Sequence, residues 1–259
     1  MGSAPYEDPR LTRSYDRGND MPETSLLAWA HKIISFSPKE RPAVLDVGVG
    51  TGVFAWALAD GGWPTGVTGV DPSRAMLQQA QRRGRRPDVH LICGDAVSLP
   101  FASSSFDLAL LSRVVHHIPA RDKCAAELHR VLRQRGVVVV RTTVRERLDS
   151  LVYDYWPQLL ARDLTRFPSA DDVIADFEQA GFVNSAVESY AQPVHTHLAA
   201  FHDAMALRPQ SKFRFLSEQE FSAGLLALRR DVDAQPASGR GMAERYDLLV
   251  FAKPGTAAS

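Results

Sequence analysis

The sequence predicts an α/β protein built around a doubly wound, mostly parallel sheet. From Ala43 onward, short apolar segments of strand length alternate with amphipathic segments of helix length, as such sheets require. The first apolar segment, 44–47, leads directly into a turn that contains Gly48, Gly50 and Gly52, and a helix pattern follows. The second segment, 66–70, ends at a single carboxylate, Asp71, about twenty residues beyond the turn. This order is the front half of a domain that holds a nucleoside.

The remaining elements follow in order along the chain. Residues 1–20 are polar and rich in turn formers, and a helix is predicted from about Pro22. The helix after the fourth strand would place Cys124, Leu128, Val131 and Leu132 on one face. Five core strands are predicted at 44–47, 66–70, 89–93, 106–111 and 136–140.

The pattern loosens after Thr143. Ser169 is predicted to begin a helix, a sixth strand follows at 182–190, and a last strand is predicted at 245–252. Between these two strands, Ser217 and Glu220 form a capping box that opens a helix. We therefore expect an arm and helix that cover the site (1–35), a cofactor-binding catalytic domain (36–194 and 241–254), an inserted helical cap for the substrate (195–240) and a tail (255–259).

Composition narrows the possible partners. The 259 residues carry a formal net charge of zero, so no general attraction to nucleic acid or an anionic membrane is expected. The two cysteines form neither a disulfide framework nor a metal site, and no apolar run approaches the ~20 residues of a membrane span. We expect a cytoplasmic monomer or homodimer without a metal, and a small molecule as its substrate.

The glycine spacing narrows the choice of nucleoside. Gly-x-Gly-x-Gly differs from the Gly-x-Gly-x-x-Gly of dinucleotide sites, which aims a helix N-terminus at a pyrophosphate. An acid, Asp46, stands just before the turn, where it would repel a diphosphate and favour a cation. S-adenosylmethionine, which carries sulfonium and ammonium charges and no phosphate, fits this description. A nicotinamide-dependent oxidoreductase is the less favoured alternative, since the spacing is wrong and no lysine lies near Tyr153 and Tyr155.

Further polar groups stand where the other strands end. Ligands bind outside the carboxyl ends of strands in open α/β sheets. The third strand ends at Gly94-Asp95-Ala96, and the Asp95 carboxylate can accept a hydrogen bond from an exocyclic amine. The fourth ends at Ser112, followed by His116 and His117, and Met76 is placed to lie against an adenine face.

Together, the segments 44–54, Asp71, 94–96, 106–107, 116–118, 131–133 and Gly136 resemble the class I S-adenosylmethionine-dependent methyltransferases. Within that class the chain is similar to the small-molecule branch that includes the ubiquinone and menaquinone C-methyltransferases. The resemblance covers about residues 40–145, with Arg-Gln-Arg-Gly136 in place of the family's Arg-Pro-Gly-Gly as a departure. It implies a Rossmann-like, doubly wound, seven-stranded sheet that is mostly parallel with an antiparallel last strand, plus a helical cap.

The resemblance also implies roles for individual residues. Residues 112–117, including Ser112, would close over the sulfonium. Arg17, in the segment Tyr15-Asp-Arg-Gly18, would pair with the methionine carboxylate. The other residues implied at the cofactor are Asp46, Gly48, Gly50 and Gly52 near the methionine part, Asp71 and Pro72 at the ribose, and Met76, Asp95 and Ala96 at the adenine.

Methyl transfer is an in-line displacement, which requires the acceptor to be aligned and water to be excluded. His116 and His117 are the candidates for a base that exposes the nucleophile, although packing would equally explain the pair. Aromatic residues after the fifth strand, beginning with Tyr153, Tyr155 and Trp156, suit an apolar or aromatic acceptor in a biosynthetic tailoring step. A protein that binds S-adenosylmethionine without transferring its methyl group, as a cyclase or regulatory partner, is the alternative.

Overall fold

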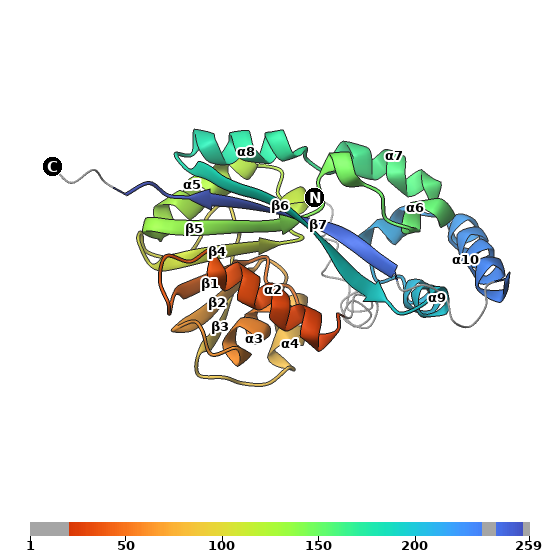
Figure 1. The fold of residues 1–259 in the computed structure, drawn as a ribbon, viewed down its shortest axis with the longest axis horizontal. Helices are drawn as coiled ribbons and strands as arrows, with labels where there is room; N and C mark the ends of the chain where they lie inside the picture. Colours follow the sequence, from red (N-terminus) through yellow and green to blue (C-terminus); the bar gives the residue numbers. More distant parts are fainter. Residues whose placement is uncertain (1–20, 235–241, 256–259) are drawn as a thin grey trace.

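The computed structural model describes residues 21–234 and 242–255. Seven strands form one sheet in the order β3-β2-β1-β4-β5-β7-β6 (Figure 1). Strands β1 to β5 pair in parallel, whereas β7 is antiparallel to both of its neighbours. The strands are β1 (Ala43–Val47), β2 (Gly66–Asp71), β3 (Val89–Cys93), β4 (Phe106–Ser112), β5 (Leu132–Thr142), β6 (Val183–His195) and β7 (Met242–Ala252). The predicted fold class is confirmed.

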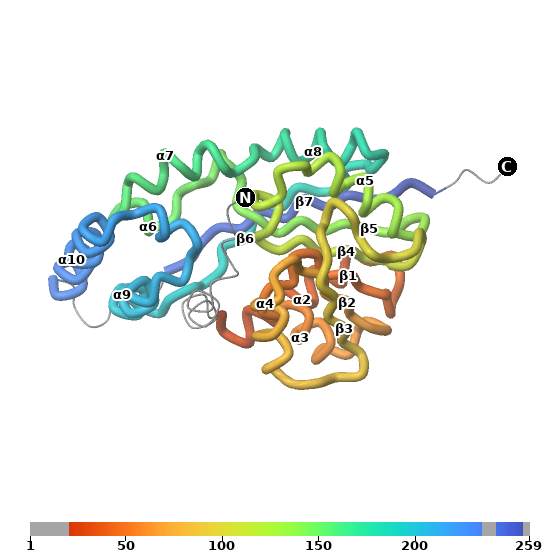
Figure 2. Tube along the Cα trace, turned by 180° about the vertical axis from the view of Figure 1, so that it is seen from behind, coloured from red at the N-terminus to blue at the C-terminus, as the bar shows by residue number. Residues whose placement is uncertain are grey.

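Helices cover both faces of the sheet. One face carries α2 (Glu23–Ser35), α3 (Val53–Asp60) and α4 (Arg74–Gln81), and the other carries α5 (Arg121–Val131) and α8 (Ala170–Gln179) (Figures 1 and 2). Successive residues of strand β4 pack alternately against the helices of the two faces. Leu108 and Leu110 pack in the cluster that contains α2 and α3, whereas Ala109 and Leu111 pack in the cluster that contains α5 and α8. The chain reverses its winding between β1 and β4, which opens a crevice at their carboxyl ends.

Four further helices form a cap at the end of the sheet: α6 (Val152–Tyr155), α7 (Pro157–Arg166), α9 (Leu198–Ala206) and α10 (Glu218–Ala234). Figure 1 shows β6 and β7 reaching from the sheet toward them. Trp156 is fully buried in the cap core, where it stacks on Phe221 with ring centroids 5.7 Å apart. The helices of 152–166 thus share one apolar core with those of 198–234. The described residues also contain short 3-10 turns at Val115–His117, Arg145–Arg147 and Ser211–Phe215.

Several predicted boundaries differ from the structure, among them that of β5, which was predicted at 136–140 and spans Leu132–Thr142. Leu132 is not helical, because α5 ends at Val131 and Leu132 is extended and pairs with Phe106 as the first residue of β5. Strands β6 and β7 are longer than predicted, since they continue as a two-stranded ribbon that ends at the pair His195 and Met242. The ribbon therefore carries the sheet as far as the cap.

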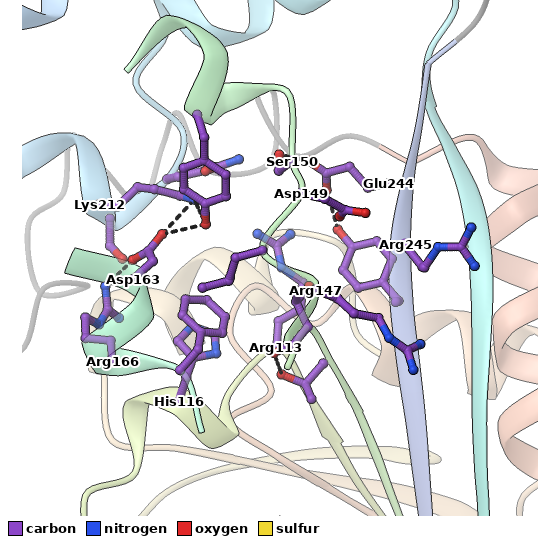
Figure 3. A pocket seen from close by; sticks show the side chains of 18 of the residues that line it. Arg113, His116, Arg147, Asp149, Ser150, Asp163, Arg166, Lys212, Glu244 and Arg245 are labelled. Carbon is purple, nitrogen blue, oxygen red and sulfur yellow. Dashed lines mark hydrogen bonds and ion pairs between the residues drawn. The ribbon is translucent and has the colours of Figure 1, made fainter. Parts of the chain in front are cut away.

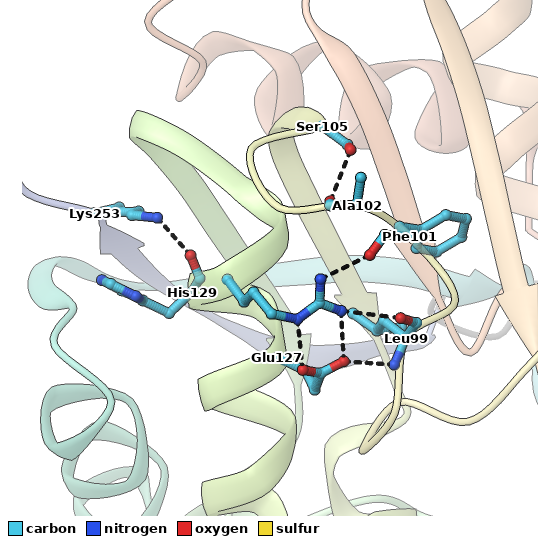
Figure 4. Close-up of polar contacts among 8 residues, drawn as sticks. Leu99, Phe101, Ala102, Ser105, Glu127, His129 and Lys253 are labelled. Atoms are coloured by element: carbon cyan, nitrogen blue, oxygen red, sulfur yellow. Dashed lines mark hydrogen bonds and ion pairs between the residues drawn. The ribbon is translucent and has the colours of Figure 1, made fainter.

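A polar clamp fixes the loop between β3 and β4 to helix α5. The Leu99 amide donates a hydrogen bond to Glu127 Oε2 at 2.7 Å (Figure 4). The Arg130 guanidinium donates to Glu127 and to the carbonyls of Leu99 and Phe101 at 3.0 and 2.7 Å. Because Asp95 lies directly before this loop, the clamp holds the end of β3 in place.

Candidate active site

The glycine turn adopts a backbone that only glycine takes readily. Gly48, Gly50 and Gly52 have φ angles of +70°, +55° and +82°. A Cβ at Gly48 would lie 2.4 Å from the side chain of Val114. A Cβ at Gly50 would meet nothing closer than the Gly48 carbonyl at 3.9 Å, so this side of the turn is open to a ligand.

Asp71 ties the turn to the next helix. Its Oδ2 accepts from the Gly50 amide at 2.9 Å, and its Oδ1 accepts from the Ser73 amide at 2.8 Å. Ser73 in turn caps α4 by accepting from the Met76 amide. Each carboxylate oxygen has a second lone pair, so these contacts leave Asp71 able to accept from ribose hydroxyls. The open turn and this carboxylate fit a nucleoside that carries no phosphate.

Asp46 gives the site a second carboxylate. It lies at the end of β1 and is 2% exposed. Burial, reinforced by the nearby charge of Asp71, raises the pKa of Asp46 to about 7. Asp46 and Asp71 lie at the ends of adjacent strands, so a positively charged ligand would offset the repulsion between their carboxylates.

The other predicted cofactor residues are spread around the same edge of the sheet. Asp95 is exposed and accepts from the Val97 amide at 3.1 Å, and Ala96 packs against the core that contains α5. Pro72 is exposed at the start of the loop into α4, whereas Met76 is buried at 2% exposure. Arg17 lies outside the described residues.

Ser112 contacts a buried arginine that the sequence analysis missed. Arg141 Nη1 donates to Ser112 Oγ at 3.3 Å, and the guanidinium stacks on Tyr246 and Trp29 at 3.9 and 4.5 Å from the ring centroids. Burial lowers the pKa of Arg141 to about 10, so it stays charged at neutral pH. The predicted strand ended at Val140, which left Arg141 outside it.

A cavity of about 280 Å³ lies between the ends of β4 and β5 and the cap (Figure 3). The sheet side contributes Arg113, His116 and His117, and the cap contributes Tyr153 and Lys212 among others. The segment 113–117 forms a partition, because Val114 touches the glycine turn while its neighbours line the cavity. The two predicted catalytic histidines therefore face a chamber on the opposite side from Gly48.

The two histidines differ in their bonding. His116 stacks on Phe167 with centroids 4.1 Å apart, and its Nδ1 is buried without a hydrogen-bond partner among the described residues. His117 Nδ1 lies 3.2 Å from Arg166 Nη2 and must accept, since a guanidinium only donates. Burial, His117 and then Arg166 hold the pKa of His116 well below its usual value, and burial and Arg166 lower that of His117 to about 4. Both rings are neutral at pH 7.

The cap wall of the cavity holds a charged cluster that the sequence analysis did not identify. Asp163 is fully buried, and its Oδ2 accepts from Tyr153 Oη and Lys212 Nζ, each at 2.9 Å. Arg166 Nη1 lies 3.8 Å from the other carboxylate oxygen. Asp163 and Arg166 lie three residues apart on α7, but Tyr153 comes from α6 and Lys212 from the turn Ser211–Phe215, so no sequence motif identifies the whole cluster. The one sequence signal was the rarity of lysine, of which the chain has five.

Comparison with known proteins bears on the class of the protein. Residues 45–140 match a family model described as a methyltransferase domain. A demethylmenaquinone methyltransferase of Staphylococcus aureus is 28% identical over 216 residues, which cover 74% of this chain and 88% of the relative.

Solved structures share the fold. A candidate methyltransferase from an antibiotic biosynthesis pathway of Anabaena variabilis superposes with a TM-score of 0.68 at 23% identity, over 86% of this chain and 96% of that one. The [4+2]-cyclase SpnF superposes with a TM-score of 0.61 at 24% identity, over 88% and 81%.

The fold, the glycine turn and the sequence matches together support a class I S-adenosylmethionine-dependent methyltransferase. The matching methyltransferase domain indicates S-adenosylmethionine as the cofactor. Over residues 21–234 and 242–255, no helix combines the length and apolar character needed to cross a membrane.

Proposed function

We propose that this enzyme methylates a small molecule held in the cavity beneath the cap, as a tailoring step in biosynthesis. The observation that carries the proposal is the partition at 113–117. Val114 of this segment lies beside the open glycine turn and its neighbours line the cavity, so a donor at the turn and an acceptor in the cavity would both border the segment and would be aligned at its edge.

The residues on the donor side would hold the cofactor in a fixed pose. S-adenosylmethionine supplies, when bound, an electrophilic methyl group on a cationic sulfur. The Asp71 carboxylate would accept from the ribose hydroxyls while it fixes Gly50, and the buried Asp46 would favour the positive charge nearby. Gly50 would allow close approach, because its missing Cβ leaves open space.

On the acceptor side, His116 is the better candidate for a base. It is neutral at pH 7 and its Nδ1 has no partner in the described part of the chain, whereas His117 Nδ1 is engaged by Arg166. Nδ1 of His116 can take the proton of an acceptor hydroxyl as the oxygen or ring carbon attacks the methyl group. The cap would exclude water from this step.

The kind of acceptor follows from the lining and the relatives. Tyr153, Phe167 and Tyr246 offer aromatic faces to the cavity, which supports a ring-containing acceptor. The S. aureus relative is named for demethylmenaquinone, and the Anabaena variabilis protein is described as part of antibiotic biosynthesis. Both support a small organic acceptor rather than a macromolecule.

The test is methyl transfer from S-adenosylmethionine with a labelled methyl group to a panel of phenols, quinols and hydroxy acids. We expect the label in a small product, with one equivalent of S-adenosylhomocysteine formed for each. Conversion of an acceptor without S-adenosylhomocysteine would contradict methyl transfer and favour the alternative of a cyclase, whose fold SpnF shares.

A further inference from the structure

Among the described residues that line the cavity, positively charged side chains outnumber negatively charged ones. Its lining includes five arginine and lysine side chains, Arg113, Arg147, Arg166, Lys212 and Arg245, against three carboxylates, Asp149, Asp163 and Glu244. Arg245 and Asp149 are exposed, where solvent screens their charges. Arg147 is paired with the buried Asp247 behind the wall. The charge balance inside the cavity therefore depends on the remaining groups.

The excess positive charge is concentrated on the side of the cavity that the cap forms. On this side, Asp163 is shared by two cations, Lys212 at 2.9 Å and Arg166 at 3.8 Å. Lys212 is largely buried, with a side chain 13% exposed, and that of Arg166 is 25% exposed. Figure 3 shows Lys212, Asp163 and Arg166 together, with His116 next to them. Burial lowers the pKa of Lys212, and its ion pair with Asp163 opposes this effect; with all three side chains ionised, the group carries a net charge of +1.

Arg113 adds a cation from the sheet side in an unusual conformation. It has a φ of +57°, in a region that residues other than glycine rarely adopt. It lines the cavity just after the end of β4. Strain of this kind persists where the surrounding structure fixes it, and it occurs preferentially at functional sites. Glu244 faces Arg113 across the lining. Burial raises the pKa of Glu244, but Arg113, Ser150, Tyr246 and Lys212 more than offset this, so the carboxyl is ionised.

The pKa shifts of the two histidines indicate the sign of the electrostatic potential in the cavity. Besides burial, the cations Arg166, Arg113 and Lys212 each lower the pKa of His116. At His117 the cations Arg166, Arg113 and Arg214 outweigh the opposing effect of Asp163. The potential beside both rings is therefore positive.

We propose that the methyl acceptor carries an oxyanion, a carboxylate or a phosphate, which binds between Arg166 and Lys212 on the cap wall and Arg113 opposite them. This inference rests on the proposed function, since it places the acceptor in the same cavity. An anion there would complete the cluster that has two cations and one carboxylate. It would also hold the aromatic part of the acceptor against Phe167 and His116.

The experiment is calorimetric titration of the full chain, saturated with S-adenosylhomocysteine, with benzoate, phenyl phosphate and benzamide. Benzamide has the shape of benzoate without its charge. We expect at least one anion to bind about tenfold or more tightly than benzamide, which corresponds to one charged contact. The stronger of the two anions identifies the group as carboxylate or phosphate.

Variants locate the anion. Lys212→Met, Arg166→Gln and Arg113→Gly should each weaken the preferred anion about tenfold and leave benzamide unchanged. Arg113→Gly is the most useful, because glycine suits the left-handed backbone and the fold should survive. Arg82→Gln, on the exposed end of α4, is the matched control and should change nothing.

Equal binding of benzamide and both anions, or no binding of either anion to the protein with S-adenosylhomocysteine bound, would overturn the inference and leave the methyltransferase proposal standing. Failure to bind S-adenosylhomocysteine at all would count against the proposed cofactor site instead.

Discussion

Asp46 stands out among the residues at the cofactor side because it is both buried and close to another carboxylate. Burial and Asp71 raise its pKa from 3.8 to about 7. The folded protein therefore binds a proton at Asp46 more tightly than the unfolded chain does. It follows that the free energy of unfolding falls as pH rises from about 4 toward about 7.

We predict that Asp46→Asn stabilises the protein without cofactor more at pH 8 than at pH 5, by roughly 2 kcal/mol of difference between the two pH values. Urea unfolding of both proteins at each pH measures this. The same variant should lose more affinity for S-adenosylmethionine than for S-adenosylhomocysteine, since only the former carries the sulfonium charge. Parallel stability curves for the two proteins would show that Asp46 does not titrate as described.

The unequal bonding of the two histidines leads to a second prediction. His116→Ala should slow turnover by about 10²–10⁴-fold if its free Nδ1 accepts the acceptor's proton. His117→Ala should have a smaller effect, since its Nδ1 is already engaged by Arg166. Neither change should abolish binding of S-adenosylhomocysteine. Full turnover in the variant that lacks both rings would remove the pair from the mechanism.

At the scale of elements, the glycine turn and the segment after β4 are coupled through one contact. Val114 occupies the space that a side chain at Gly48 would need. The donor side and the histidine side of the partition are thus built against each other, and a change in one should move the other.

Gly48→Ala should lower the free energy of unfolding by roughly 2–5 kcal/mol, from a left-handed backbone and an overlap with Val114 at 2.4 Å. Gly62→Ala is the matched control, because Gly62 has the same φ of +70° and open space around it, and should cost only about 1–2 kcal/mol. Adding Val114→Ala to Gly48→Ala should recover part of the stability. Equal losses for the two glycines would refute the coupling.

At the scale of the whole molecule, sheet and cap have separate cores. Phe177 stacks on Phe251 in the core beside the sheet, whereas Phe221 stacks on Trp156 in the cap. The cavity lies where the two parts meet. Damage to the cap should therefore affect acceptor binding before it affects the cofactor.

Phe221→Ala should destabilise the cap by about 3–5 kcal/mol and speed hydrogen exchange in α6 and α10. Turnover should fall while affinity for S-adenosylhomocysteine stays within about twofold. Phe177→Ala, of similar burial, should instead loosen α5 and α8 beside the sheet. Loss of cofactor binding in Phe221→Ala would show that the two cores are not independent.

Much of the fold could be predicted because its signals are local. Strand β3 was placed at its observed bounds, and both the helix start at Ser169 and the capping box at Ser217 are present as predicted. The full lengths of β6 and β7 could not be predicted, because their ends depend on pairing with each other. Leu132 was misassigned since an apolar residue at helical spacing also suits a buried strand.

The two halves of the site also differ in whether their residues are close together in the sequence. The cofactor side follows the chain, from Gly48 to Asp71, so spacing alone pointed to it. The acceptor side joins Tyr153, Asp163, Arg166 and Lys212, which meet only after the cap has folded. The charges that surround the cavity therefore became visible in the structure and not in the sequence.

In the proposed enzyme, the cofactor and the acceptor bind at separate places, both of them beside residues 113–117. Titration of S-adenosylhomocysteine into the native protein, Asp71→Ala and Lys212→Met tests it most directly, with NADH as a control ligand. We predict tight binding to the native protein and to Lys212→Met, a loss of about 1–3 kcal/mol in Asp71→Ala, and no binding of NADH. Unchanged affinity in Asp71→Ala, or an equal loss in Lys212→Met, would contradict the account.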